Sequence, residues 1–421
     1  MKKLFLALGM TCALSASAQN YNGYIVKLKP GYESFVNTNM ADAQVRKLSF
    51  GTFAVVKQKF EGLVQDPAVE YVEKNWIINL NEFSAPQQDD SSLTENRDEQ
   101  FSKQWGLLND GSNSGGWFSR GKAGEDINAT AAWNVETGNR DLVVAVIDTG
   151  VDYTHTDLKA NTWKNEGEIA GNGIDDDGNG FIDDVYGYDF ANKDGDPMDG
   201  HSHGTHCAGV IGARHNGTGI MGVMANVKIM SIKFLSDSGS GETIDAISSI
   251  DYAVANGAKI LSNSWGGGEY SEALKESIEN ARDKGVLFVA AAGNSRMDND
   301  SRPTYPANYD VANVITVGAM DGKGNRSSFS NYGQETVHVF APGSNILSTV
   351  PNNRYKKMSG TSMATPMVSG VLGLLLSKED GLSFSEIKER IYSTSVPNPG
   401  LITKAKSGRI EAYRLLNNIQ N

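Results

Sequence analysis

Cysteine, positive charge and long apolar runs are all scarce in this sequence. Only two of the 421 residues are cysteines, Cys12 and Cys207. Cys12 falls in the N-terminal leader described below, so the rest of the chain cannot form an intrachain disulfide. The net charge of −12 argues against nucleic acid as a main partner. The length still allows a large core, which must stabilise the fold together with bound ions.

The first residues have the composition of a secretory signal. The chain starts with a basic Met-Lys-Lys, residues 4–16 are apolar, and residues 16–18 (Ala-Ser-Ala) form a small-residue cleavage signal. The apolar run is too short for a stable membrane span. We therefore predict a signal peptide over residues 1–18 and a secreted or periplasmic protein.

Three polar residues stand next to apolar elements at places where chemistry is often located. Residues 143–147 form a buried-strand pattern that ends at Asp148, and ligands of parallel sheets bind at the carboxyl ends of strands. His203 begins a helix of small residues. Ser362 lies between a glycine turn and an apolar helix, whose first N–H groups have no partner within the helix. Taken singly, these residues are more typical of helix caps and of an ordinary histidine than of an active site.

Together the three residues supply the parts of a hydroxyl-nucleophile triad. Ser362 would attack an acyl carbon, His203 would move the proton, and Asp148 would orient the imidazole. Their order along the chain, Asp, His, Ser, is that of subtilisin and differs from that of chymotrypsin. With these motifs, residues 101–417 resemble the subtilisin-like serine peptidases. Three motifs in the right order are far more specific than any one of them.

The resemblance assigns roles to two further polar residues. Asn294 follows the strand pattern over residues 286–291, and it would donate to the oxyanion together with the backbone N–H of Ser362. In the segment His-Gly-Thr-His, the resemblance makes the first histidine, His203, catalytic and the second, His206, structural. Spacing alone leaves that choice open, because the two lie near each other on one helix.

The same resemblance implies a binding site for an extended peptide that pairs with two backbone segments. These segments are Ser264-Trp265-Gly266 and Gly239-Ser240-Gly241, and the pocket for the residue before the scissile bond would be lined by Ala291, Ala292 and Gly293. The pocket walls are small, and Thr304 is placed at its floor, where no acidic residue is evident. We therefore expect a large apolar substrate side chain there. Trp265 fits a core position equally well.

An acidic loop over residues 171–184 predicts a calcium site. It resembles the start of an EF-hand loop, although Tyr186 stands where the closing glutamate would be. The candidate ligands are Asp175, Asp177, Asn179, Phe181 through its carbonyl, and Asp183 or Asp184. Such crowding of like charges is unfavourable without a cation. An acidic surface loop is the ordinary alternative.

The resemblance alone implies a second calcium site. Its side-chain ligands would be Asp157 and Asn216. Backbone carbonyls would complete it, from Arg214, Thr218 and Ile220.

Strand and helix patterns alternate through most of the chain, which predicts an α/β fold with three layers and a mostly parallel central sheet over residues 101–421. Strands are expected at 143–147, 227–232, 259–263, 286–291 and 313–317, with helices such as 243–256 and 270–284. Residues 19–84 resemble the family's inhibitory propeptide, a small α+β domain, with strands at 24–29, 53–57 and 69–76. An unrelated binding module is the alternative for that unit.

Residues 85–100 are polar and are expected to form a flexible linker, with maturation cleavage within it or just before it. The whole chain is thus predicted to be a secreted, calcium-stabilised serine endopeptidase, monomeric and inhibited by its own propeptide until processed. Its partners would be protein or peptide substrates. An inactive binding protein on the same fold is disfavoured because all four catalytic positions are intact. A serine esterase is disfavoured because no Gly-x-Ser-x-Gly surrounds Ser362.

Overall fold

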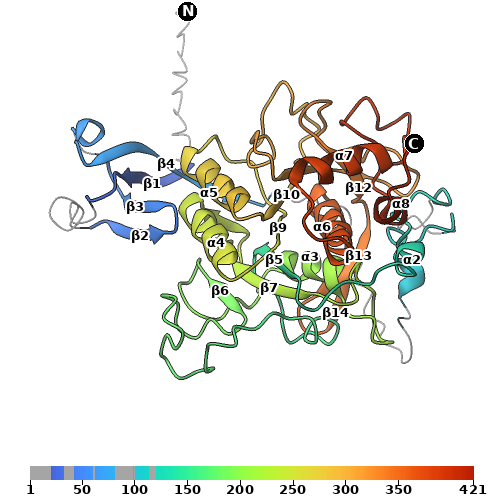
Figure 1. The fold of residues 1–421 in the computed structure, drawn as a ribbon, viewed down its shortest axis with the longest axis horizontal. Coiled ribbons are helices and arrows are strands. Elements are labelled where there is room, and N and C mark those ends of the chain that lie inside the picture. The colour runs from blue at the N-terminus through green and yellow to red at the C-terminus, as the bar shows by residue number, and fades with distance from the viewer. Residues whose placement is uncertain (1–19, 33–41, 60–61, 81–97, 99, 113–119) are drawn as a thin grey trace, which may run out of the picture.

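The structure is a computed structural model of the whole chain. It describes residues 20–32, 42–59, 62–80, 98, 100–112 and 120–421 (Figure 1). The predicted signal peptide, residues 1–18, and most of the predicted linker, residues 85–97, lie outside the described residues.

A parallel sheet of seven strands forms the centre of the molecule. Its order is β12-β11-β10-β9-β5-β7-β6, and its paired strands run parallel. The strands are β5 (Val143–Asp148), β6 (Gly187–Asp189), β7 (Lys228–Lys233), β9 (Ile260–Asn263), β10 (Leu287–Ala291), β11 (Val314–Met320) and β12 (Val339–Pro342). Their sequences are largely apolar because helices cover both faces, as all six buried residues of β5 illustrate.

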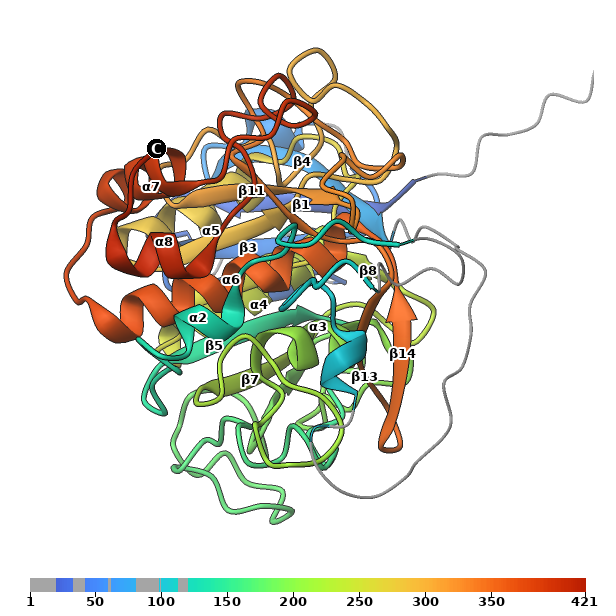
Figure 2. The same ribbon diagram turned by 90° about the vertical axis from the view of Figure 1, so that its right-hand side faces the viewer.

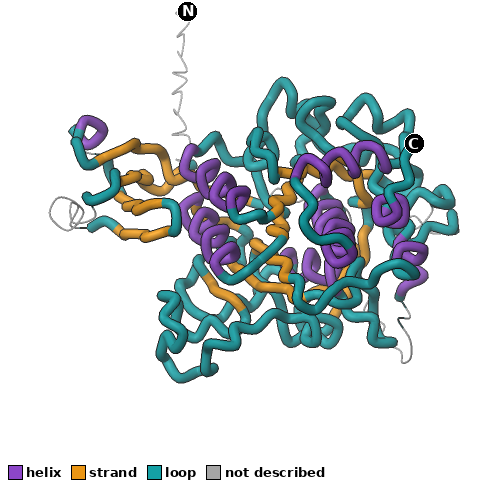
Figure 3. The backbone as a smooth tube through the Cα atoms, viewed as in Figure 1, coloured by secondary structure: helices purple, strands orange, loops and turns teal. Residues whose placement is uncertain are grey.

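Two helical layers enclose the sheet (Figures 2 and 3). Alternate residues of β5 separate the two cores: Val144 and Val146 pack with α6 on one face, and Ala145 and Ile147 pack with α4 and α5 on the other. The first layer holds α2 (Ala129–Ala132), α3 (His203–Gly212), α6 (Thr361–Lys378), α7 (Phe384–Thr394) and α8 (Ala412–Asn417). The second holds α4 (Thr243–Ala255) and α5 (Glu272–Asp283). The predicted three-layer α/β fold is therefore confirmed.

The predicted strands and helices of this domain begin and end close to the observed ones, apart from β11, which continues three residues further, to Met320. The short strands β6 and β12 were not predicted. Neither was the hairpin of β13 (Ile346–Val350) and β14 (Arg354–Met358), which leads into α6. In the described parts of the chain, no helix is both long and apolar enough to cross a bilayer.

The N-terminal unit adds an antiparallel sheet at the side of α4 and α5 (blue in Figure 1). Its strands are β1 (Tyr21–Leu28), β2 (Gln44–Leu48), β3 (Gly51–Val56) and β4 (Val69–Asn79), in the order β2-β3-β1-β4, with β2 not predicted. A 3₁₀ turn, η1 (Leu63–Gln65), precedes β4, and η2 (Phe101–Lys103) begins the larger domain. One face of this sheet places Ile25 and Phe53 in the core formed with α4 and α5.

Candidate active site

Several polar residues meet at the carboxyl edge of the central sheet. Asp148 is the last residue of β5, and Ser264 directly follows β9. Asn294 comes three residues after the end of β10. His203 begins α3, and Ser362 is the second residue of α6. This edge is where open parallel sheets bind ligands.

Asp148 and His203 form a buried hydrogen-bonded pair. The Nδ1 atom of His203 lies 2.7 Å from Oδ1 of Asp148. A carboxylate only accepts, so Nδ1 carries the proton, and Nε2 is the ring atom that can take up another one. The same oxygen accepts from the backbone N–H of Thr149 at 2.8 Å, which fixes the carboxylate. The arrangement suits a general base.

Asp199 holds the two segments of this pair together. Its Oδ1 accepts from the hydroxyl of Thr149 at 2.9 Å and from the backbone N–H of Ser202 at 2.9 Å, while its Oδ2 accepts from the hydroxyl of Thr205 at 2.6 Å. The turn after β5 and the start of α3 therefore share one buried carboxylate. Asp199 was not among the predicted site residues. The sequence feature that could have identified it is an aspartate just before the start of a helix, where such residues accept from N–H groups that have no helical partner.

A proline shapes the surroundings of Ser362. Pro366 has no N–H, so the carbonyl of Ser362 cannot accept the helical hydrogen bond from the residue four positions later. Two groups from other segments use that carbonyl: the hydroxyl of Ser264 at 2.9 Å and the thiol of Cys207 at 3.4 Å. In return, the hydroxyl of Ser362 donates to the carbonyl of Ser264 at 3.0 Å. The start of α6 is thereby tied to β9 and α3.

His206 has a different environment from His203. Its Nε2 lies 2.9 Å from the carbonyl oxygen of Ile346 and 3.1 Å from that of Lys356. A ring nitrogen between two carbonyls must donate, and burial lowers the pKa of His206 to about 3, so the ring is neutral. His206 therefore fastens α3 to the β13–β14 hairpin.

Asn294 is oriented by Thr361. Its Oδ1 accepts from both the backbone N–H and the hydroxyl of Thr361, each at 2.9 Å. Because the amide oxygen accepts from Thr361, the Nδ2 group is the donor end of this side chain. The preceding Gly293 has φ +107°, and a Cβ there would lie 2.6 Å from Nδ2 of Asn331, so only glycine fits.

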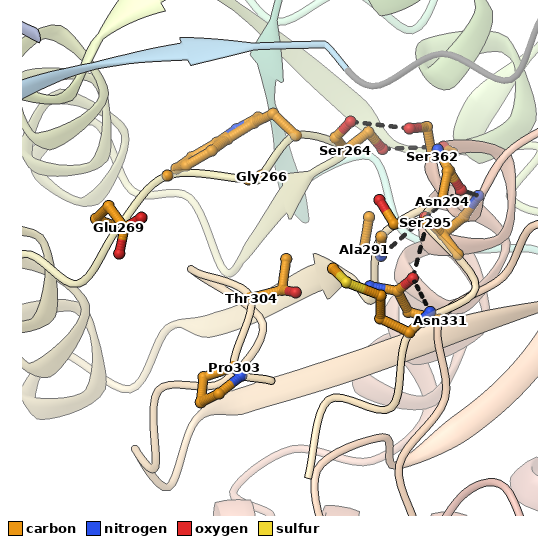
Figure 4. Close-up of a pocket in the computed structure, with 16 residues that line it drawn as sticks. Ser264, Gly266, Glu269, Ala291, Asn294, Ser295, Pro303, Thr304, Asn331 and Ser362 are labelled. Carbon is orange, nitrogen blue, oxygen red and sulfur yellow. Dashed lines mark hydrogen bonds between the residues drawn. The ribbon is translucent and has the colours of Figure 1, made fainter. Parts of the chain in front are cut away.

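A cavity of about 280 Å³ lies beside Ser362 and Asn294 (Figure 4). It is lined by Ser264, Trp265, Gly266, Gly267, Gly268, Glu269, Ala291, Gly293, Asn294, Ser295, Met297, Pro303, Thr304, Asn331, Thr361 and Ser362. Of the predicted pocket residues, Ala291 and Gly293 line it, whereas Ala292 lies in the core on the α6 side. Trp265 lines the cavity and is also part of the core, because its buried ring packs on that of Phe234 with centroids 4.9 Å apart. Glu269 was not among the predicted pocket residues.

The other predicted substrate segment is paired with the N-terminal unit. Gly239 precedes β8 (Ser240–Glu242), which continues the sheet of the N-terminal unit next to β4. Ile78 is opposite Gly241 and Asn79 is opposite Ser240, in antiparallel register. The backbone N–H of Leu80 donates to the carbonyl of Gly239 at 2.8 Å. A strand of this chain thus occupies the edge where an extended peptide was expected.

Comparison with known proteins decides the family. A sequence model of the subtilase family matches residues 139–413. The chain belongs to the subtilase family, whose members are serine endopeptidases. It is 39% identical to thermitase from Thermoactinomyces vulgaris over 300 residues, 71% of this chain and 96% of that protein. A thermophilic serine proteinase from Bacillus sp. (strain AK1) is 42% identical over 284 residues, 67% of this chain but only 63% of that relative.

Solved structures agree with this assignment. The subtilase resembles the crystal structure of a cold-adapted subtilisin-like serine proteinase with a TM-score of 0.52 and 36% identity. The match covers 63% of this chain and 88% of that one. Sequence and fold thus lead to the same family.

The acidic loop of this subtilase gathers three carboxylates. Oxygens of Glu168, Asp175 and Asp177 all lie within 4.8 Å of one another. Oxygen donors of this kind suit calcium. Glu168 was not predicted, because it precedes the loop motif. Asn179 is held by the same loop, with its backbone N–H donating to Asp175 at 3.0 Å.

The remaining predicted residues of the loop have other contacts. Asp184 is buried and accepts from the hydroxyl of Tyr252 at 2.5 Å. Asp183 accepts from the backbone N–H of Gly173 at 3.0 Å. The ring of Phe181 packs edge-to-face on Tyr252, with centroids 4.9 Å apart. The two contacts with Tyr252 anchor the loop to α4.

The second predicted calcium site contains oxygens that the protein leaves unsatisfied. Asp157 accepts from Nδ2 of Asn216 at 3.2 Å and from the backbone N–H of Ile220 at 3.1 Å. Nearby, Oδ1 of Asp98 and Oε1 of Gln100 are buried and have no hydrogen-bond partner among the described residues. Burial, and then the charge of Asp157, raise the pKa of Asp98. Orphaned buried oxygens beside a carboxylate fit a cation. Sequence reasoning missed both Asp98 and Gln100.

Asn294→Asp tests the donor next to Ser362. The substitution keeps an acceptor for Thr361 but removes the Nδ2 donor. We expect kcat on a peptide substrate to fall by about 10²–10³, the loss measured for such a donor in subtilisin itself, with little change in KM. Steady-state kinetics provide the measurement. Asn417→Asp, exposed on α8, is the control, and an unchanged kcat for Asn294→Asp would contradict the role of this donor.

Proposed function

We propose that this subtilase is a secreted or periplasmic endopeptidase that cleaves protein or peptide substrates through Ser362, His203 and Asp148. The observation that carries the proposal is the buried 2.7 Å hydrogen bond between Asp148 and His203 beside the start of α6. Cys207 connects the groups: its sulfur lies within 4.8 Å of ligand atoms of both Asp148 and His203, and it contacts the Ser362 carbonyl. Asp148, His203 and Ser362 are each more than nine-tenths buried.

The reaction has two halves. The hydroxyl of Ser362 gives up its hydrogen bond to Ser264, transfers its proton to Nε2 of His203 and attacks the peptide carbonyl carbon. The tetrahedral intermediate collapses as His203 protonates the leaving amine, which leaves an acyl-enzyme. Water then attacks the ester, again with His203 as base, and releases the acid. Asp148 stabilises the imidazolium throughout but keeps its charge.

The oxyanion is stabilised by donors that are already in place. Nδ2 of Asn294 is oriented by the bonds from Thr361 to its oxygen. The backbone N–H of Ser362 belongs to the first turn of α6, where helical N–H groups have no partner within the helix. Preorganised donors of this kind contribute a large part of the rate enhancement in acyl transfer.

The substrate is proposed to bind as an extended strand between Ser264–Gly266 and Gly239–Gly241. The antiparallel pairing of β4 with β8 supports this proposal. Such backbone pairing tolerates many sequences. The pocket beside Ser362 then receives the side chain before the scissile bond.

Residues 19–84 are proposed to act as an inhibitory propeptide within a monomeric precursor. Their strand β4 covers the substrate edge at β8, and the unit also caps two helices of the peptidase domain. Glu73 accepts from Oγ of Ser271 at 2.6 Å and from the N–H of Glu272 at 2.8 Å, at the start of α5. Oδ1 of Asn75 accepts from the N–H of Ile244 at 3.1 Å, at the start of α4.

The proposed precursor has four parts: a signal peptide over residues 1–18, the propeptide over 19–84, a linker over 85–100 and the peptidase domain over 101–421. Cleavage within the linker or just before it would release the propeptide from the covalent chain. Leu80, the last described residue before the linker, lies at the substrate edge, which supports a cut soon after it.

Calcium is proposed to bind at two places. In the loop, Glu168, Asp175 and Asp177 would hold one ion. Asp157, Asn216, Gln100 and Asp98 would hold the other. At each place an ion would neutralise crowded carboxylates, and at the second place it would also link segments remote in sequence. Both effects would stabilise a secreted chain without disulfides.

Labelling and substrate comparison test the proposed function. We expect a fluorophosphonate to modify Ser362 of the processed enzyme, Ser362→Ala to abolish both labelling and casein hydrolysis, and casein to be cleaved far better than a short-chain ester. Peptide mapping identifies the labelled residue. Absence of labelling in a folded enzyme would indicate an inactive binding protein, and preference for the ester would indicate an esterase.

Glu73→Ala tests the propeptide. The substitution removes charged acceptors from the start of α5, and each such hydrogen bond contributes about 1.5–3 kcal/mol. We expect the processed propeptide to dissociate sooner, so that the lag before peptide hydrolysis shortens about tenfold or more. Glu70→Ala is the control, because Glu70 pairs with Lys27 inside the unit. An unchanged lag in Glu73→Ala would contradict the proposal.

Chelation tests the calcium sites. We expect EDTA to lower the melting temperature of the processed enzyme and excess calcium to restore it, since a site saturated at 100 times its Kd stabilises by about 2.7 kcal/mol. Asp175→Asn and Asp157→Asn should each remove one part of this response. Asp141→Asn, an exposed carboxylate outside both sites, should respond like the wild type. A melting temperature insensitive to EDTA would exclude stabilising calcium.

A further inference from the structure

We propose that Glu269 makes the pocket beside Ser362 accept a lysine or arginine side chain before the scissile bond, in addition to the apolar ones expected from the sequence. The inference rests on the proposed function, because it names the substrate class of the same site.

The charge in the pocket is confined to one end. Ser362 and Asn294 lie at one end of the cavity, and Glu269 lies at the other (Figure 4). Glu269 is the only charged residue among those that line the cavity. A substrate side chain that enters beside Ser362 and extends through the cavity therefore ends near a carboxylate.

No described residue neutralises Glu269 by a hydrogen bond or an ion pair. Thr304 and Asn331, two polar side chains that also line the cavity, are engaged with Asn299. The hydroxyl of Thr304 bonds to Oδ1 of Asn299 at 3.3 Å. Nδ2 of Asn331 donates to the same oxygen at 3.0 Å, and Oδ1 of Asn331 accepts from the N–H of Met297 at 3.0 Å. Glu269 is thus the charged group of the cavity lining, and it has no partner among the described residues.

The backbone on both sides of Glu269 is anchored to Tyr305. Gly268 forms a β-bridge with Tyr305, and the N–H of Gly267 donates to its carbonyl at 3.0 Å. On the other side, the ring of Tyr270 packs edge-to-face on that of Tyr305, with centroids 5.4 Å apart. These contacts position the loop, in which Glu269 lines the cavity.

The walls between the two ends suit the stem of a basic residue. Ala291, Met297 and Pro303 present apolar surface along the cavity. Lysine and arginine pack their methylene stems on such surface while the charged head remains hydrated. Because Glu269 is exposed, the pair would resemble a surface ion pair and would contribute modestly and in a salt-dependent way. Apolar side chains, which use only the walls, remain substrates.

Paired substrates test the inference on the processed enzyme. Two peptide p-nitroanilides are compared that differ only in the residue before the scissile bond, lysine in one and methionine in the other. In Glu269→Gln, which preserves shape, we expect the kcat/KM ratio of lysine to methionine to fall about three- to fivefold, with the methionine value unchanged. Glu269→Lys should lower the ratio further. Glu389→Gln, exposed on α7, is the matched control.

Salt provides a second readout. Raising the ionic strength from about 0.05 M to 0.5 M should lower the wild-type ratio and leave that of Glu269→Gln unchanged. An equal ratio in wild type and Glu269→Gln would overturn the inference and make Glu269 a solvated charge at the rim. Equal losses on both substrates would overturn it too, because Glu269 would then only support the pocket's shape. Failure of the proposed function is distinct: the wild type would cleave neither substrate and would not react with a fluorophosphonate.

Discussion

The site depends on the close contact between the turn after β5 and the first turn of α3. A Cβ at Gly204 would lie 2.0 Å from the carbonyl oxygen of Gly150, so any side chain there would force the helix away from the strand. Asp199 adds hydrogen bonds to both segments. Asp148 and His203 are thus held together by their neighbours and need no substrate to bring them together, which is the preorganisation that acid–base catalysis requires.

Contacts from other segments also fix the start of α6. Pro366 removes one helical hydrogen bond, and the freed carbonyl of Ser362 accepts from Ser264 and Cys207, which belong to other segments. The carbonyl that has no helical partner therefore links three parts of the fold: the start of α6, the residue after β9, and α3. The nucleophile, the strand that would flank the substrate and the helix that carries the base then keep one relative position. Asn294 joins them through Thr361, the neighbour of Ser362.

The features that could be predicted from the sequence are those that depend on residues close together in the chain. The central strands are apolar throughout, because both faces of the sheet are covered, so their pattern predicted the fold closely. Asp148, His203 and Ser362 stand in distinctive motifs and were proposed from them. Residues that act through distant contacts were missed. Asp199 connects Thr149 with Thr205, Gln100 lies near Asp157 across the chain, and Glu269 follows three glycines that read as an ordinary loop. Their roles depend on contacts that form only in the folded chain, and the sequence pattern does not show these contacts.

The proposed inhibitor and the proposed substrate share one edge but differ in what else they contact. A substrate would use the strand edge at β8 and the pocket, whereas the N-terminal unit also binds the starts of α4 and α5 through Asn75 and Glu73. Burial raises the pKa of Glu73 in this interface, although its hydrogen bonds to α5 oppose the shift. The unit therefore also has contacts outside the cleft. Inhibition strength and pocket selectivity can then vary separately, since Glu269 faces the cavity and Glu73 faces a helix terminus.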